Sequence, residues 1–136
     1  MTPTFLDASG WFAALSPRDQ YHGSAAPFYQ DLLGGRRRIV TTNLVIAEVH
    51  SLLVRTSADT GVRFLDRLYS DPRHEVIWAS RDLERAAVDR WLRPFLKVRF
   101  SLTDAVSFEV MRLQGVKRAF SYDRHFVAAG FEMVPA

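Results

Sequence analysis

Apolar residues recur along the chain in two alternating patterns. Short apolar runs typical of buried strands cover residues 2–6, 37–41, 75–79, 118–121 and 131–134. Longer segments with helical periodicity lie between them, at residues 9–15, 19–33, 43–56, 59–69, 80–91, 103–114 and 123–129. This alternation predicts an α/β fold with a mostly parallel sheet of about five strands and helices on both faces.

Small polar residues mark several helix starts. Thr42 or Asn43 is expected to cap the helix that ends near residue 56, and Ser101 or Thr103 the helix that ends before Gly115. No repeat, linker or low-complexity tract interrupts the pattern. The sequence therefore predicts one domain over residues 1–136.

Composition excludes several classes of protein. The chain has no cysteine, which rules out disulfides and thiolate metal sites and fits a cytoplasmic location. It has no apolar run long enough to span a membrane and no signal-peptide pattern, so no membrane association is expected. The 18 Lys and Arg residues exceed the 15 Asp and Glu residues, an excess that permits contact with nucleic acid without identifying it.

Two acids directly follow predicted strands. Asp7 comes after the apolar pair Phe5-Leu6, and Asp123 comes after residues 118–121. Parallel sheets place binding sites beyond the carboxyl ends of their strands, so both acids are expected at one edge. Each also has a structural alternative, because an Asp after a strand often caps the following helix.

Glu48 lies at the border of the apolar face of a predicted helix. Val45, Val49 and Leu52 form that face, and Glu48 projects along its edge. A glutamate is almost never buried without a partner. The position therefore favours either a ligand-binding role or a rim salt bridge with a distant arginine.

Asp104 stands in the first turn of its predicted helix. It shares a face with Phe108 and Met111, so its carboxylate is expected to point inward. The spacing Ser101-x-x-Asp104 also resembles a capping box, and the helix dipole favours an acid at this end. Capping and ligand binding are both open roles here.

The four acids become more informative when taken together. An α/β fold can bring Asp7, Glu48, Asp104 and Asp123 to one edge of the sheet. Two carboxylates about 4 Å apart repel by roughly 4 kcal/mol at an effective dielectric constant near 20, and a divalent cation would offset that repulsion. Oxygen donors favour Mg²⁺ or Mn²⁺, which can bind phosphate and activate water for phosphodiester hydrolysis.

Four segments in order resemble the motifs of the PIN-domain ribonucleases. They are TFLDASGWFAAL, TTNLVIAEVHSLL, SLTDAVSFEVM and AFSYDRHF, and they extend over nearly the whole chain. The chain looks most like the small VapC-type toxins of bacterial type II toxin–antitoxin pairs. The resemblance implies a three-layer α/β/α sandwich and a metal-dependent endoribonuclease with the acidic quartet Asp7, Glu48, Asp104 and Asp123.

The resemblance also implies roles within the quartet. Asp7 and Asp104 would be the most direct metal ligands, and Glu48 and Asp123 would act through water or a second ion. The cleaved RNA would carry 5′-phosphate and 3′-hydroxyl ends.

Polar residues beside the acids are candidates for supporting roles. Ser9 and Ser121 each lie two residues from a motif acid, and Asn43 and Thr103 are placed to support acids or to contact phosphate. Some relatives carry a further acid where this chain has His125. That histidine could contact substrate, but a surface position is favoured because no metal-ligand spacing accompanies it.

Basic and aromatic side chains offer candidate RNA contacts. Residues 36–38 form one basic run, and Arg93, Lys97 and Arg99 form another that is favoured because it precedes the Asp104 helix. Solvated surface is the alternative for both runs. Three aromatic residues near motif acids are candidates for base stacking: Trp11, Phe100 and Tyr122. Trp11 is nevertheless expected to lie in the core or in an interface.

Partners follow from the resemblance. VapC-type proteins usually dimerise and are inhibited by an antitoxin that docks in a groove of early helices, here residues 19–33, 45–56 and 59–69, and can place an arginine in the acidic site. The apolar surface would come from two clusters: Phe28, Tyr29, Leu32 and Leu33, and Phe64, Leu65, Leu68 and Tyr69.

Three alternative functions remain open from the sequence. One is an RNA-processing nuclease that is not a toxin. Another is a catalytically silent domain that binds RNA or protein. The third is a receiver-like signalling module, which the sequence disfavours because Asp7 has no acidic neighbour and Lys117 precedes a strand.

Overall fold

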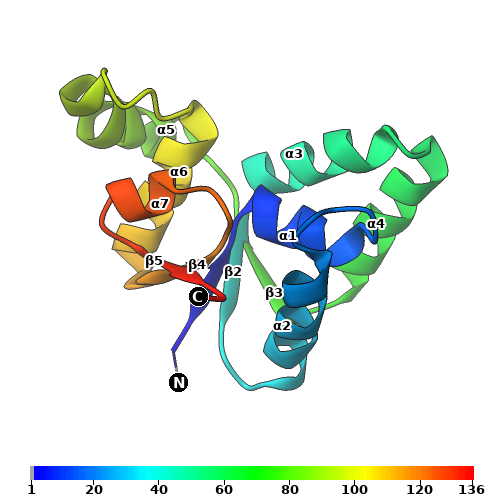
Figure 1. Ribbon diagram of the computed structural model, residues 1–136. Coiled ribbons are helices and arrows are strands. Elements are labelled where there is room, and N and C mark those ends of the chain that lie inside the picture. Colours follow the sequence, from blue (N-terminus) through cyan, green and yellow to red (C-terminus); the bar gives the residue numbers. More distant parts are fainter. Residues whose placement is uncertain (1) are drawn as a thin grey trace.

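The computed structural model describes residues 2–136 as a sheet between two layers of helices (Figure 1). The five strands are β1 (Thr4–Leu6), β2 (Ile39–Thr42), β3 (His74–Ile77), β4 (Arg118–Phe120) and β5 (Glu132–Val134). Their order is β3-β2-β1-β4-β5, and every neighbouring pair is parallel. The predicted α/β/α fold is confirmed, with a wholly parallel sheet.

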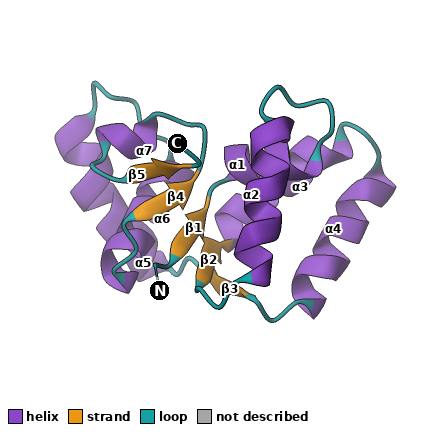
Figure 2. Ribbon diagram, turned by 60° about the horizontal axis from the view of Figure 1, so that its bottom comes forward, coloured by secondary structure: helices purple, strands orange, loops and turns teal. Residues whose placement is uncertain are grey.

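The helices divide between the two faces of the sheet (Figure 2). One layer contains α1 (Ala8–Leu15), α2 (His22–Gly34), α3 (Asn43–Val54) and α4 (Ala58–Ser70). The other contains α5 (Arg81–Ala87), α6 (Leu102–Gln114) and α7 (His125–Ala128). No helix among residues 2–136 combines the length and apolarity that a membrane span requires.

Two predicted helices differ from the structure by three or more residues at one end. The segment expected over residues 19–33 becomes helical only at His22. Before it the chain forms a turn, in which the Asp19 carboxylate accepts the Tyr21 amide and the Asp19 carbonyl accepts the His22 amide. The helix expected over residues 80–91 ends at Ala87 and continues as a π-helical turn (Val88–Leu92) and a 3₁₀ turn (Arg93–Phe95). Pro94 lacks an amide hydrogen and so cannot extend an α-helix.

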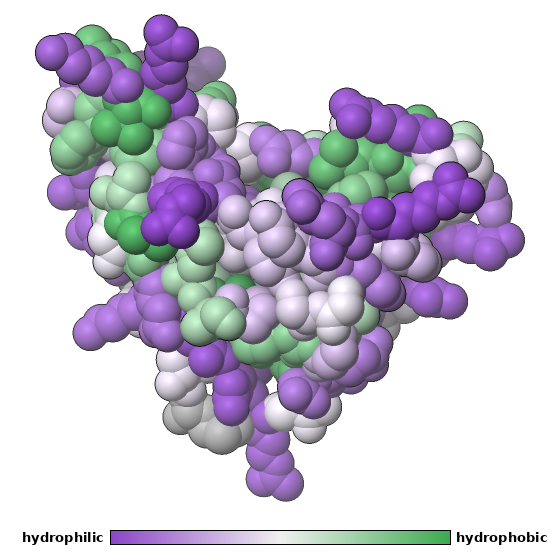
Figure 3. Space-filling model, in the orientation of Figure 1, coloured by the Kyte–Doolittle hydropathy of each residue, from purple (hydrophilic) through white to green (hydrophobic). Residues whose placement is uncertain are grey.

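The strand order creates a crevice between β1 and β4. The chain leaves β1 into α1 on one face of the sheet and leaves β4 toward α7 on the other (Figure 1). Divergent connections at the carboxyl ends of neighbouring strands open the sheet edge, where α/β proteins bind ligands. Figure 3 shows the surface hollowed at this edge, between the two lobes that the helix layers form.

Aromatic packing holds the layers against the sheet. Phe5, Phe108, Phe120 and Phe126 are fully buried, and the Phe108 and Phe126 rings meet edge to face with centroids 5.0 Å apart. Phe5 and Phe120 belong to the two strands that border the crevice. The core therefore fixes the crevice walls.

Close packing between α1 and β4 makes Gly10 necessary. A Cβ atom at Gly10 would lie 2.4 Å from the Phe120 carbonyl oxygen and 2.7 Å from its carbonyl carbon. These are backbone atoms of the central sheet, so they cannot rotate out of the way. Only glycine lets the first turn of α1 approach the strand this closely.

We expect Gly10→Ala to lower the free energy of unfolding by about 2 kcal/mol or more, because the added methyl overpacks the α1–β4 contact. Gly23→Ala is the matched control, since a Cβ there would meet nothing within 4 Å. That change should stabilise α2 by about 0.5 kcal/mol through helix propensity. Urea unfolding of both variants measures the difference, and equal effects would contradict the packing argument.

Candidate active site

Asp7 is the most buried of the four predicted acids. It lies directly after β1, with 6% of its surface exposed, and its Oδ2 accepts hydrogen bonds from the Ser9 and Ser121 hydroxyls, both at 2.8 Å. Those hydroxyls in turn accept the backbone amides of Tyr122 and Asp123. Asp7 occupies the N-cap position of α1 but makes no side-chain cap, so the capping alternative is wrong for this residue.

The environment of Asp7 disfavours its ionised form. Burial raises its pKa from 3.8 to about 6, the Ser121 and Ser9 hydrogen bonds oppose that shift, and the charge of Asp123 adds to it. A hydrogen bond from a neutral hydroxyl stabilises a carboxylate less than one from a positively charged group. Asp7 is therefore a buried acid whose charge lacks compensation.

Glu109 shows how a structural carboxylate is stabilised in the same protein. It is also buried on α6, but Arg112 and Arg90 bind it at 2.9 and 3.0 Å, and the Trp91 indole donates to it at 3.1 Å. The Arg112 hydrogen bond keeps the pKa of Glu109 below its usual value despite burial. The contrast marks Asp7 as a place where a cation would be stabilising.

Asp104 combines the two roles that its sequence position left open. It is buried on the first turn of α6, where the predicted capping box with Ser101 is present: each residue's side chain accepts the other's amide at 3.0 Å. The Asp104 bonds to Ser101 and to His125 both use Oδ2. Within residues 2–136 no hydrogen bond ends on Oδ1, so that oxygen remains available to a ligand.

His125 is 37% exposed, as expected for a surface histidine, but its imidazole also faces the acids. Its Nδ1 lies 3.0 Å from Asp104 Oδ2 and 3.8 Å from Asp123 Oδ1. Asp123 also accepts the His125 amide at 2.9 Å. This Asx-type turn, which the Asp-x-His spacing permits, directs the imidazole back toward the crevice.

Glu48 lies at the rim of the same crevice. Its side chain is exposed on α3, and Thr103 of α6 lines the same hollow. Partial burial raises its pKa, and the charges of Asp104 and Asp123 raise it further. No ion pair within residues 2–136 includes Glu48, so the predicted alternative of a rim salt bridge is wrong.

The supporting residues divide between the acids and the scaffold. The Ser9 and Ser121 hydroxyls donate to Asp7, and Thr103 lies beside Glu48. The Asn43 side-chain oxygen instead accepts the Ala79 amide at 2.8 Å and so holds the chain after β3.

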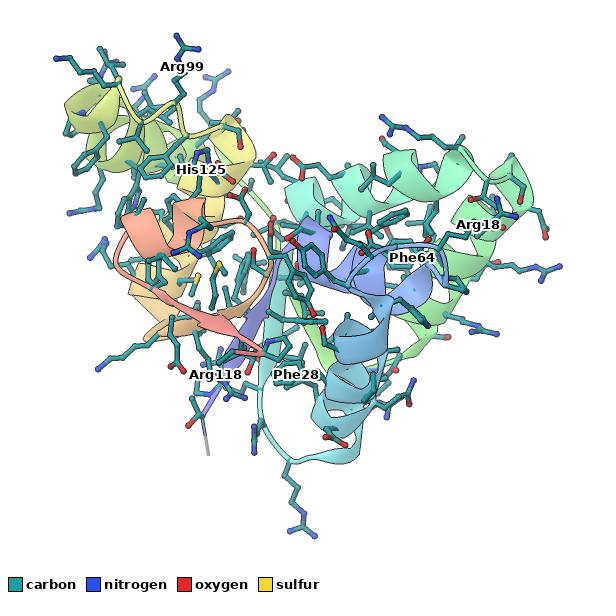
Figure 4. All side chains as sticks on the ribbon, viewed as in Figure 1. Arg18, Phe28, Phe64, Arg99, Arg118 and His125 are labelled. Carbon is teal, nitrogen blue, oxygen red and sulfur yellow. The ribbon has the colours of Figure 1, made fainter. Side chains whose placement is uncertain are left out.

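The predicted basic runs lie in different places. Residues 36–38 precede β2, at the amino end of the sheet and away from the acids, and Arg38 pairs there with Glu75 at 2.6 Å. In the second run Arg93 pairs with Asp89, whereas Arg99 is exposed in the loop before α6 and points outward beyond His125 (Figure 4). Arg99 also has a left-handed φ of 64°, which is rare for a side-chain-bearing residue.

The predicted aromatic candidates differ in exposure. Trp11 is 1% exposed in the core, as expected, and stacks on His74. Phe100 is also buried. Tyr122, next to Asp123, stacks on Tyr21 with ring centroids 4.1 Å apart, which makes it the best placed of the three to contact a base.

A second hollow lies on the helix layer away from the acids. A groove of about 750 Å³ runs between α1, α2 and α4, and α3 contributes only Leu53. Its floor includes Trp11, Phe64 and Leu68, and arginines from α4 and the following turn line it: Arg63, Arg67 and Arg73. A groove thus lies among the predicted helices, with α1 in place of most of α3, and its role in docking stays a prediction. Phe28 packs instead on Phe120 of the sheet.

The acidic edge fits a divalent cation by its donor chemistry. One ligand atom each from Asp104, Asp123 and His125 lies within 4.8 Å of the other two, and the buried Asp7 carboxylate stands beside them through its Ser121 link. Carboxylate oxygens with at most one imidazole suit ions such as Mg²⁺ or Mn²⁺.

Comparison with known proteins identifies the family. The sequence matches the PIN domain over residues 4–132. This chain belongs to the PIN-domain family. It is 32% identical over 128 residues to the 23S rRNA-specific endonuclease VapC20 of Mycobacterium tuberculosis, in both strains CDC 1551 / Oshkosh and ATCC 25618 / H37Rv, covering 93% of this chain and 94% of that protein.

The fold of a solved PIN-domain relative agrees closely. The crystal structure of Mycobacterium tuberculosis VapC20, described as a sarcin-ricin loop cleaving toxin, superposes with a TM-score of 0.83 at 31% identity. The match covers 94% of this chain and 95% of the relative. The receiver-like alternative is excluded by membership of the PIN-domain family.

Neutralising Asp7 should stabilise the metal-free PIN domain at high pH. The native pKa of about 6 exceeds the unfolded value of 3.8, so wild type loses stability as pH rises from about 4 to 6. Asp7→Asn keeps the acceptor for Ser9 and Ser121 and removes the buried charge. In EDTA, urea unfolding should show a gain of about 3 kcal/mol at pH 8 and almost none at pH 3.

Asp66→Asn on the exposed face of α4 is the control, and it should change stability little at either pH. A loss of stability for Asp7→Asn at pH 8 would show that its charge is compensated in the folded protein.

Proposed function

We propose that this chain is a metal-dependent endoribonuclease of the VapC type, formed by a single PIN domain over residues 1–136. The observation that carries the proposal is the convergence of Asp7, Asp104 and Asp123 on one sheet edge, where the buried Asp7 pairs with no arginine in the part of the chain that the structure describes. Glu48 completes the acidic quartet from the rim.

The chain's own residues would hold the cation and the water. Asp104 offers Oδ1, Asp123 offers a half-exposed carboxylate, and Asp7 and Glu48 bind directly or through water. When bound, Mg²⁺ or Mn²⁺ would polarise a phosphodiester and lower the pKa of a water molecule. The Ser9 and Ser121 hydroxyls hold Asp7 in place, which limits reorganisation when RNA binds.

RNA would lie across the crevice between the two lobes. Arg99, in the loop before α6, is placed to contact a phosphate outside the acidic edge. The stacked Tyr21–Tyr122 pair beside Asp123 offers an aromatic surface for an unpaired base. The sarcin-ricin loop named for VapC20 is the first structured substrate to test.

We further propose that the protein is the cytoplasmic toxin of a toxin–antitoxin pair and forms a homodimer. The groove between α1, α2 and α4 would receive the antitoxin. Its apolar floor and arginines fit an amphipathic segment that carries acidic residues. An antitoxin reading frame beside the gene would distinguish a toxin from an RNA-processing nuclease.

We expect Asp104→Asn to reduce RNA cleavage at least about 100-fold, because it removes a ligand charge from the proposed site. Ser101→Ala is the matched control: it removes the capping hydroxyl, costs about 1 kcal/mol of stability and leaves every acid in place. Cleavage of single-stranded and sarcin-ricin loop RNA is measured with antitoxin-free protein in Mg²⁺, Mn²⁺ or EDTA. Activity that persists in EDTA would overturn the metal-dependent mechanism.

We expect Leu15→Asp to weaken antitoxin binding about 100-fold while RNA cleavage persists. Leu15 is 37% exposed on α1 and lines the groove, so a carboxylate there would be desolvated by an apolar partner. Leu113→Asp, at an exposed leucine of α6 outside the groove, is the control. Titration of the purified variants with antitoxin measures the affinities, and equal losses would refute the groove assignment.

A further inference from the structure

His125 is the one member of the acidic edge that the quartet does not include. Its Nδ1 lies within 4 Å of carboxylate oxygens from both Asp104 and Asp123, at 3.0 and 3.8 Å. These three residues form the single group of potential metal ligands found within residues 2–136, and Asp7 and Glu48 stand outside it. The tightest donor set at this edge therefore contains an imidazole nitrogen.

The orientation of the imidazole is fixed by its surroundings. The adjacent Phe126 is fully buried, which anchors the start of α7, and the Phe100 ring meets the imidazole edge to face at 5.3 Å and 88°. Figure 4 shows His125 beside the start of α6, where Asp104 lies. A ring held in this way loses little conformational entropy when it binds a ligand.

The imidazole lies close enough to both carboxylates to share a cation with them. Octahedral ligands about 2.1 Å from a metal stand about 3.0 Å apart when adjacent and about 4.2 Å apart when opposite. His125 Nδ1 lies 3.0 Å from Asp104 Oδ2 and 3.8 Å from Asp123 Oδ1, so a small rotation of the Asp104 carboxylate would present its free Oδ1 to the same cation. Imidazole nitrogen also favours first-row transition metals, whereas carboxylates alone suit Mg²⁺ equally well.

We infer that His125 is a direct metal ligand and that it shifts the preference of the site from Mg²⁺ toward Mn²⁺. This inference rests on the proposed metal-dependent function. The competing role is purely orienting: the imidazole would hydrogen-bond to Asp104 and hold it without binding metal. The two roles predict different effects on the two cations.

The test measures binding of the metal alone to the full chain. Calorimetric titrations give the Mn²⁺ and Mg²⁺ affinities of wild type, His125→Ala, His125→Asn and His125→Asp. Pulsed electron paramagnetic resonance of the Mn²⁺ complexes detects a coordinated imidazole through its ¹⁴N coupling. Circular dichroism confirms that each variant is folded, as expected for a side chain that is 37% exposed.

A ligand role predicts a ¹⁴N coupling in wild type that is absent from all three variants. His125→Ala should lower Mn²⁺ affinity at least about 10-fold and Mg²⁺ affinity about 3-fold or less. His125→Asp, with an all-oxygen site, should bring the Mn²⁺ to Mg²⁺ affinity ratio below that of wild type. His125→Asn retains a hydrogen-bond donor for Asp104 and should still lose Mn²⁺ affinity.

Three results would overturn the inference. They are a wild-type Mn²⁺ complex without ¹⁴N coupling, equal losses for both cations in His125→Ala, and full recovery of Mn²⁺ affinity in His125→Asn. If any of these results is found while wild type cleaves RNA only with a divalent cation, the inference fails and the proposed function stands. If wild type neither binds either cation nor cleaves RNA, both fail.

Discussion

The crevice is organised by the hydrogen bonds that join Asp7 to the end of β4. Asp7 directly follows β1, and Ser121, which directly follows β4, donates to the Asp7 carboxylate at 2.8 Å. The same hydroxyl accepts the Asp123 amide, so a single serine sets the position of two acids. Because β1 and β4 are neighbours whose chains leave on opposite faces, this link closes the base of the crevice that their divergence opens.

Two buried carboxylates in one small protein show different solutions to the same electrostatic problem. Glu109 is paired with arginines on its own side of the sheet, and its pKa is lowered. The Asp7 carboxylate has no basic partner within residues 2–136, and burial raises its pKa to about 6 despite its hydrogen bonds to two hydroxyls. A structural acid would gain stability from a basic partner, as Glu109 does. The retention of an uncompensated charge at the crevice is therefore best explained by a ligand that carries positive charge.

The sequence was sufficient for the architecture and for the edge at which the acids lie. The alternation of strand and helix patterns predicted the parallel sheet. Because binding sites lie beyond the carboxyl ends of parallel strands, Asp7 and Asp123 were expected at the same edge. The direction of His125 was not predictable, because it depends on an Asx-type turn and on the Phe100 ring, which is distant in sequence. Asn43 illustrates the same limit, since its partner Ala79 belongs to a different crossover. Periodicity reports which face of an element is buried and says nothing about contacts between loops.

Asp104 explains how one residue can serve both the fold and the site. A capping box usually has Glu or Gln at this position, and the side chain of that residue accepts a hydrogen bond from the N-cap amide. In Asp104 the cap and the His125 contact share Oδ2, which leaves Oδ1 for a ligand. The N-terminus of α6 also directs the positive end of its dipole toward this carboxylate. Capping thus supports ligand binding, because the hydrogen bond that begins the helix also fixes the position of the carboxylate.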